Sequence, residues 1–221
     1  MNWNAIFEAL ETWRSALKAQ NEEDPAVTAV AETYRNDPWA VLASTILSLR
    51  TKDDVTMRAS KALLAKAPDS ASLLALSEEE VSRLAFPAGF YRTKAKNLLA
   101  IARILGEKYD GAVPADMDAL LALPGVGRKT ANLVITEAFG MDGVCVDIHV
   151  HRISNRAGWV KTNTPEQTEA TLRKVLPRPF WRRINNLLVF YGQRLCRPVS
   201  PFCSKCVIKE HCARNGVSKS R

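Results

Sequence analysis

The sequence has no hydrophobic run long enough to span a bilayer, although 47% of its 221 residues are hydrophobic. Its first residues, Met1 to Asn4, lack the basic segment and the following apolar segment of an export signal. Long low-complexity tracts and internal repeats are also missing. These absences argue against a membrane-spanning, secreted, disordered or solenoid protein, and they predict a globular chain with its own core.

Convincing β-strands are missing as well, because no segment alternates apolar and polar residues; the closest candidate is the short run 143–146. Apolar residues instead recur at helical spacing between Trp3 and Leu17, which predicts an amphipathic first helix. Helix starts are marked by Asp37 before Pro38 and by capping boxes at 77–80 and 164–167. We therefore predict an all-α fold of about ten helices with short connections.

Charge is distributed unevenly along the chain. Residues 1–141 carry 16 Lys and Arg against 18 Asp and Glu, whereas residues 142–221 carry 15 against 5. The composition changes near residues 140–143, and the polar residues 21–36 look like a connector, so we predict a central helical domain over 31–141 and a second domain built from 1–30 plus 142–221. The basic second domain favours a polyanionic ligand, although a basic surface kept for solubility is the alternative.

A glycine-containing turn at 124–127 separates two short predicted helices, 116–123 and 128–139. Glycine lets the backbone approach a ligand closely, and the free amides that open the second helix form an anion site. A DNA phosphate would fit there without any readout of base sequence, although an ordinary turn between helices is the alternative. The basic pair Arg128-Lys129 after the turn favours the phosphate site. The candidate DNA-binding residues of this segment are Leu123, Gly125, Val126 and Gly127.

Lys129 and Asp147 are the candidate catalytic residues. Lys129 lies in the first turn of its predicted helix, where the helix dipole and Arg128 both favour the neutral amine. A neutral amine can attack an electrophilic carbon and form a Schiff base; a surface lysine that holds a phosphate is the simpler alternative. Asp147 follows an apolar run and starts a helix, so it could be an N-cap or a carboxylate beside a reacting sugar. The two roles are compatible, because a capping side chain has a fixed position.

Cysteine is scarce, with five residues in the chain, but four of them lie close together near the C-terminus. Such clustering favours a metal or cluster site over a disulfide framework. Zinc sites usually pair two short cysteine loops, whereas here one closely spaced pair is flanked by gaps of six and five residues. An iron–sulfur cluster is larger and tolerates this spacing, so it is favoured, with zinc as the alternative. The candidate ligands are Cys196, Cys203, Cys206 and Cys212, and we expect Cys145 to be a buried apolar residue.

Taken together, these motifs resemble the endonuclease III branch of the helix-hairpin-helix DNA glycosylases. The matching segments are Leu-Pro-Gly-Val-Gly-Arg-Lys-Thr-Ala-Asn at 123–132, Val-Asp-x-His at 146–149 and the spacing of the four cysteines; residues 47–51 and 89–95 match more weakly. The resemblance extends from about residue 30 to residue 212. It implies two helical domains with a DNA cleft between them, and a [4Fe-4S] cluster held by the four cysteines.

The resemblance also implies base-excision repair by a monomer acting on double-stranded DNA that contains damaged pyrimidines or abasic sites. Lys129 would attack the sugar C1′ of the flipped nucleotide with help from Asp147, and β-elimination would then break the strand. Lys129 therefore favours a combined glycosylase and abasic-site lyase over a glycosylase that only removes the base; a non-catalytic DNA-binding module is the third alternative. We expect such a protein in the cytoplasm, associated with the nucleoid through DNA and not secreted.

The chain departs from the family's pattern at three positions. Arg50 stands where the family commonly has the Gln that enters the gap left by the flipped base. Because Arg is longer and can grip guanine edges bidentately, we predict an altered opposite-base preference, toward guanine. Phe90 replaces a Leu that often acts as a wedge between bases, and an aromatic ring can do the same. Ile148 stands where Thr usually follows the Asp, so one hydroxyl is lost.

Overall fold

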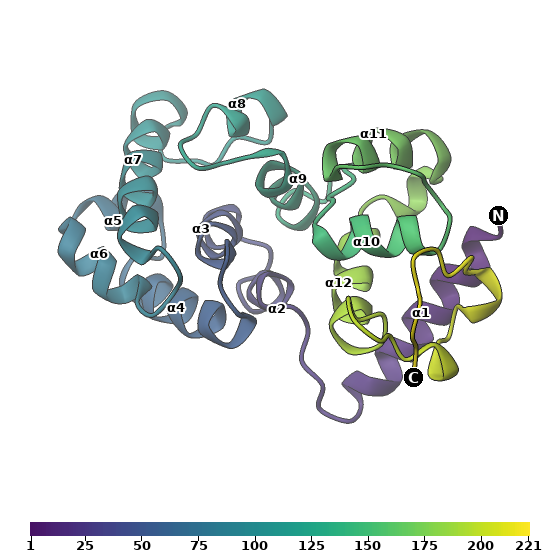
Figure 1. Ribbon diagram of the computed structural model, residues 1–221. Helices are drawn as coiled ribbons and strands as arrows, with labels where there is room; N and C mark the ends of the chain where they lie inside the picture. The colour runs from purple at the N-terminus through teal and green to yellow at the C-terminus, as the bar shows by residue number, and fades with distance from the viewer. The chain divides into compact units, whose positions relative to one another are not determined.

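The computed structural model describes all residues 1–221, and all of its regular elements are helices (Figure 1). The all-α prediction is therefore confirmed. The chain forms two compact units, of which unit 1 consists of Met1–Asp24 with Asp142–Arg221 and unit 2 consists of Pro25–Met141. None of the helices combines the length and the apolar character needed to cross a membrane.

Unit 2 is organised around the buried helix α3. Residues 39–47 of this helix are all buried, and it packs against α2, α4, α7 and α9. A helix that is apolar on every side needs such a complete shell of neighbours. The start of α3 is as the sequence predicts, because the Asp37 side chain accepts a hydrogen bond of 2.8 Å from the Ala40 amide and Pro38 is the first helical residue. The helices of unit 2 are α2 (Ala26–Thr33), α3 (Pro38–Ser48), α4 (Asp53–Lys66), α5 (Ser70–Leu74), α6 (Glu78–Ala85), α7 (Tyr91–Tyr109), α8 (Met117–Leu121) and α9 (Arg128–Glu137).

The prediction that residues 21–36 form a connector is wrong for much of this segment, because residues 26–33 form α2. This helix has no side-chain N-cap, so its start carries no local sequence signal beyond Pro25. Its small and apolar residues are buried against α3 and α4, and unit 2 accordingly begins at Pro25. Tertiary packing, more than local propensity, makes this short segment helical.

Unit 1 joins the two ends of the chain in one hydrophobic core. Helix α1 packs against α12, and the ring centroids of Phe7 and Phe180 lie 4.3 Å apart. Trp3 makes an edge contact with Trp159, with centroids 5.2 Å apart. Aromatic pairs of this kind bury large apolar areas, which explains why α1 belongs with the C-terminal third. The elements of unit 1 are α1 (Trp3–Lys18), α10 (Ile148–Arg156), α11 (Pro165–Val175), η1 (Arg178–Phe180), α12 (Ile184–Arg194), η2 (Cys203–Lys205) and η3 (Lys209–His211).

Candidate functional site

The helical hairpin predicted around residue 125 consists of α8, a turn and α9. Leu123 and Val126 are buried and anchor the turn, and the Val126 amide donates a hydrogen bond of 3.1 Å to the Leu123 carbonyl. Gly125 has φ +76°, and a Cβ there would lie 2.3 Å from Nδ2 of Asn97. Both the backbone conformation and the close approach therefore require glycine at this position.

The turn leaves the first residues of α9 accessible. Gly127 is the N-cap of α9, it is exposed, and as glycine it has no side chain that could cap the first-turn amides. Uncapped amides at a helix start, together with the helix dipole, favour an anion such as a phosphate. Lys129 is the second residue of α9 and is half-buried, so it lies within one turn of these amides. The helix ends at Glu137, two residues earlier than predicted.

Arg50 and Phe90, which are far apart in the sequence, lie side by side in unit 2. Both are exposed, and both have a left-handed backbone, with φ 53° and 57°. The guanidinium carbon of Arg50 lies 5.6 Å from the centroid of the Phe90 ring, within the range of a cation–π contact. The two residues predicted to enter the base stack are thus adjacent on the surface.

Asp147 is the N-cap of α10. Its Oδ1 accepts hydrogen bonds from the amides of His149 (2.8 Å) and Val150 (2.9 Å), so Oδ2 is not used by the cap. The capping role predicted as one alternative is confirmed, and the side chain is fixed in a buried position. Asp147 belongs to unit 1, whereas Lys129 belongs to unit 2. The next residue, Ile148, is 69% exposed, so the position where the family usually has Thr faces solvent.

Neither histidine of this segment is left without a polar partner. Nδ1 of His149 lies 3.1 Å from Nη2 of Arg152, and Nδ1 of His151 lies 2.7 Å from the hydroxyl of Thr168. Both rings therefore make polar contacts within unit 1, as structural groups do.

The four clustered cysteines lie at and beyond the end of α12. Burial raises the pKa of Cys196 and of Cys212, and the neighbouring cysteines act in the same direction on both thiols. The thiols of Cys196 and Cys212 are therefore both within electrostatic reach of Cys206. Cys145, in contrast, is 1% exposed within the segment that precedes α10, as expected for a small apolar core residue.

Two arginines of α10 hold the cysteine loop. Nη1 of Arg156 donates to Sγ of Cys196 (3.2 Å) and to the carbonyl of Arg197 (2.8 Å), and its Nη2 donates to the carbonyl of Pro198 (3.0 Å). Arg152 donates to the carbonyl of Cys196 at 2.9 Å. Two guanidinium groups beside the thiols would offset the negative charge of thiolate ligands. The sequence reasoning missed both residues, although their spacing places them on one face of the helix.

The cysteine loop offers four thiols as ligands, and a tyrosine hydroxyl lies beside one of them. Four thiols in a loop with a hydroxyl donor suit a larger cluster, whose sulfurs are commonly hydrogen-bonded. The hydroxyl of Tyr191 lies 2.8 Å from Sγ of Cys206, and burial raises the pKa of Tyr191, which keeps this donor protonated.

The segment after the last cysteine docks on the end of α10. The amide of Ala213 donates to the carbonyl of Ala157 (3.1 Å), and the amide of Asn215 donates to the carbonyl of Arg156 (2.8 Å). Gly158 has φ +78°, and a Cβ there would lie 2.9 Å from Cβ of Ala213. Helix α10 therefore carries Asp147 at its start and the cysteine loop at its end.

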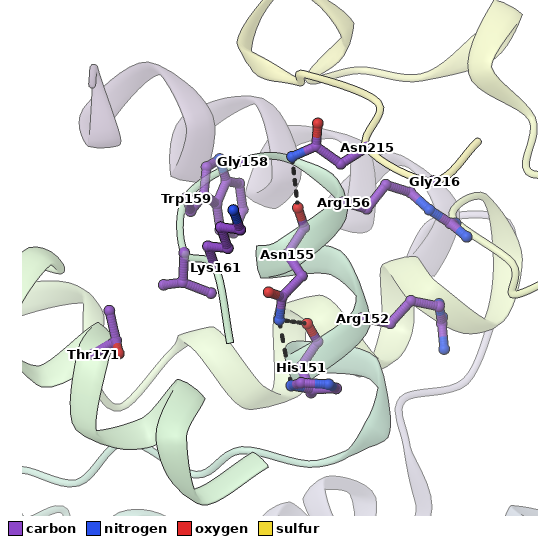
Figure 2. A pocket seen from close by; sticks show the side chains of 11 residues that line it. His151, Arg152, Asn155, Arg156, Gly158, Trp159, Lys161, Thr171, Asn215 and Gly216 are labelled. Atoms are coloured by element: carbon purple, nitrogen blue, oxygen red, sulfur yellow. Dashed lines mark hydrogen bonds between the residues drawn. The ribbon is translucent and has the colours of Figure 1, made fainter. Parts of the chain in front are cut away.

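Figure 2 shows a pocket in unit 1 that the sequence did not predict. At its centre the Asn155 side chain donates to the carbonyl of His151 (2.9 Å), and the Asn215 side chain donates to the carbonyl of Asn155 (3.1 Å). Neither candidate catalytic residue lines this pocket, and none of the cysteines does. The pocket therefore lies apart from the candidate catalytic residues and from the cysteines.

Comparison with known proteins agrees with these motifs. The family model described as HhH-GPD superfamily base excision DNA repair protein matches residues 43–178. Endonuclease III of Thermotoga maritima is 49% identical over 176 residues, which are 80% of this chain and 83% of that protein.

Two solved structures are similar over most of their length. A non-covalent endonuclease III–DNA complex is 35% identical with a TM-score of 0.76, covering 80% of this chain and 84% of that one. A trapped endonuclease III–DNA covalent intermediate, an estranged-adenine complex, is 32% identical with a TM-score of 0.76, covering 86% and 93%. The chain therefore belongs to the endonuclease III family within the HhH-GPD superfamily of base excision DNA repair proteins.

Proposed function

We propose that this protein removes oxidised pyrimidines from double-stranded DNA and then cleaves the abasic site, as a combined N-glycosylase and lyase. The observation that carries the proposal is the place of Lys129, in the first turn of α9 and directly after the turn at 124–127, whose two glycines are exposed. A phosphate held by the first-turn amides of α9 would bring a sugar close to the lysine amine. The trapped covalent complex of a relative supports covalent chemistry in this family.

The reaction begins when the damaged nucleotide leaves the base stack. Nζ of Lys129 then forms a bond to C1′ while the bond from C1′ to the base breaks, and the base departs with a proton. Opening of the sugar ring gives an imine between Lys129 and C1′. Loss of a proton from C2′ expels the 3′ phosphate, which breaks the strand, and water finally releases the lysine.

Asp147 assists because its carboxylate is fixed as an N-cap and Oδ2 is not used by the cap. A carboxylate beside the sugar can accept the proton that Lys129 loses and can stabilise the positive charge that develops as the base departs. The capping role of Asp147 and its catalytic role are therefore compatible.

Cys196, Cys203, Cys206 and Cys212 would hold a [4Fe-4S] cluster, which when bound supplies a rigid centre that folds the loop. Arg152 and Arg156 hold the loop through the carbonyl and the sulfur of Cys196 and through the carbonyls of the next two residues. The folded loop then presents the basic C-terminal segment to DNA phosphates, which gives affinity without sequence readout. The basic side chains of this segment are Arg194, Arg197, Lys205, Lys209, Arg214, Lys219 and Arg221.

Arg50 and Phe90 would enter the duplex together. The exposed Phe90 ring can wedge between two bases, and the Arg50 guanidinium, held over that ring, can reach the base opposite the lesion. Because Arg can donate two hydrogen bonds to guanine, we propose a preference for guanine opposite the lesion.

Replacing Lys129 tests the covalent step. Borohydride treatment of the protein on a duplex with one thymine glycol should give a covalent protein–DNA band, which Lys129→Ala loses. Lys129→Arg is the matched control, because it keeps the charge that binds phosphate but cannot form the imine. A trapped band with Lys129→Arg would contradict the proposal, and base release without any band from the unaltered protein would indicate a glycosylase that lacks lyase activity.

Replacing Asp147 by Asn separates capping from catalysis. Asn is as good an N-cap as Asp, so the melting temperature of Asp147→Asn should stay unchanged. Single-turnover base release should fall by roughly a hundredfold or more, because the carboxylate is lost. Unchanged base release in a normally folded Asp147→Asn protein would show that Asp147 is a cap only.

The cluster ligands can be tested one at a time. Each of the variants Cys196→Ser, Cys203→Ser, Cys206→Ser and Cys212→Ser should lose bound iron and acid-labile sulfide, because each removes one thiolate. Cys145→Ala is the control and should keep both. Zinc in place of iron in the unaltered protein, or full iron in all four serine variants, would contradict the proposed ligands.

The proposed role of Arg50 predicts that the rate of base release depends on the base opposite the lesion. Base release from one lesion should be about fivefold or more faster opposite guanine than opposite adenine, because a bidentate contact is worth at least about 1 kcal/mol. Arg50→Gln should reduce this ratio. Equal single-turnover rates with all four opposite bases would disprove the predicted preference.

A further inference from the structure

Lys94 is a buried lysine in the first turn of α7. Its side chain is 5% exposed, and its ammonium donates to three acceptors: the carbonyls of Leu47 (2.7 Å) and Leu49 (2.6 Å) and the hydroxyl of Thr51 (2.8 Å). All three of its donors are therefore used. The acceptors lie at and just beyond the end of α3, where helix carbonyls have no partner in the helix and a cation is favourable.

These acceptors surround Arg50 in the sequence. Lys94 binds the carbonyl of Leu49, which precedes Arg50, and the hydroxyl of Thr51, which follows it. Arg50 is therefore fixed on both sides. Arg50 has φ 53°, a left-handed conformation that is uncommon for a residue with a side chain. The hydrogen bonds of Lys94 to Leu49 and Thr51 flank this residue.

Lys94 is also bonded to the segment that carries Phe90. Its own amide donates to the Phe90 carbonyl at 3.0 Å, and the Gly89 amide donates to the Thr51 hydroxyl at 3.1 Å. A Cβ on Gly89 would lie 2.7 Å from the Arg50 carbonyl oxygen, so the two backbones are in close contact. The side chain of Lys94 thus binds the Arg50 segment, while its backbone amide at the start of α7 binds the Phe90 carbonyl.

We propose that Lys94 is a positioning residue, which holds the Arg50 and Phe90 loops in the arrangement needed to enter the duplex. This inference rests on the function proposed above for those two loops. Lys94 acts through its three hydrogen bonds and does not touch DNA. If Lys94 only stabilised the fold, its replacement would not selectively slow the steps in which the loops insert into the stacked bases of a duplex.

The electrostatics support this role. Burial lowers the pKa of Lys94 to about 8, because the ammonium is removed from water and all of its acceptors are neutral groups. An apolar side chain of similar length would avoid this desolvation but could not bind the three acceptors.

The test compares Lys94→Met with Lys96→Met, an exposed lysine of the same helix. Single-turnover base release from a duplex with one thymine glycol should fall about tenfold or more in Lys94→Met, because misplaced loops fail to open the stack. The preference for one opposite base should also decrease. Cleavage of a preformed abasic site in single-stranded DNA, which needs no intrusion, should be unchanged, and Lys96→Met should match the unaltered protein in every assay.

Equal losses on the duplex and on single-stranded DNA, or no loss on either, would overturn the inference. If Lys94→Met does not fold, as judged by its melting curve, Thr51→Val decides, because it removes the hydroxyl that accepts from both the Lys94 ammonium and the Gly89 amide, with little change in shape. A selective loss on duplex DNA in Thr51→Val supports the inference, and unchanged duplex activity overturns it. If the unaltered protein neither releases the base nor cleaves abasic DNA, the proposed function itself fails, whereas an active protein with unaffected variants refutes only the role of Lys94.

Discussion

The contact between α10 and the cysteine loop is the interaction on which unit 1 depends. The buried Arg156 donates to a cysteine sulfur and to two loop carbonyls, and the chain beyond the last cysteine returns to the end of the same helix. Because Asp147 caps the other end of α10, the position of this carboxylate depends on the helix that the loop holds. A local change in the loop can therefore reach the candidate catalytic residue through one rigid helix.

Unit 2 uses the same physical device with a lysine. The ammonium of Lys94 binds carbonyls at the end of α3, as the guanidinium of Arg156 binds carbonyls beyond α12. In both places a buried cation satisfies backbone groups that no regular element can pair, which costs desolvation but fixes an irregular loop. Such loops carry function because a rigid scaffold positions them.

Local sequence signals predicted the start of several elements correctly. Asp37 and Asp147 each accept a hydrogen bond from an amide in the following turn, as their places before helical patterns indicated, whereas Asp116, predicted as the first helical residue, is the N-cap of α8. The turn at 124–127 has the predicted helix on each side, and Gly125 needs its positive φ. The segment 21–36 was misread because α2 lacks a side-chain cap and its burial depends on α3 and α4.

The sequence by itself determined the helical class, the family and the identity of the candidate residues, because caps, turn glycines and cysteine spacing act over a few residues. Only the tertiary structure decided which side chains support those residues. The bond from Lys94 to Leu47 joins positions 47 residues apart, and the bond from Arg156 to Cys196 joins positions 40 residues apart. No local pattern encodes such pairs, because they form only when separate helices pack and leave buried polar groups that must find partners.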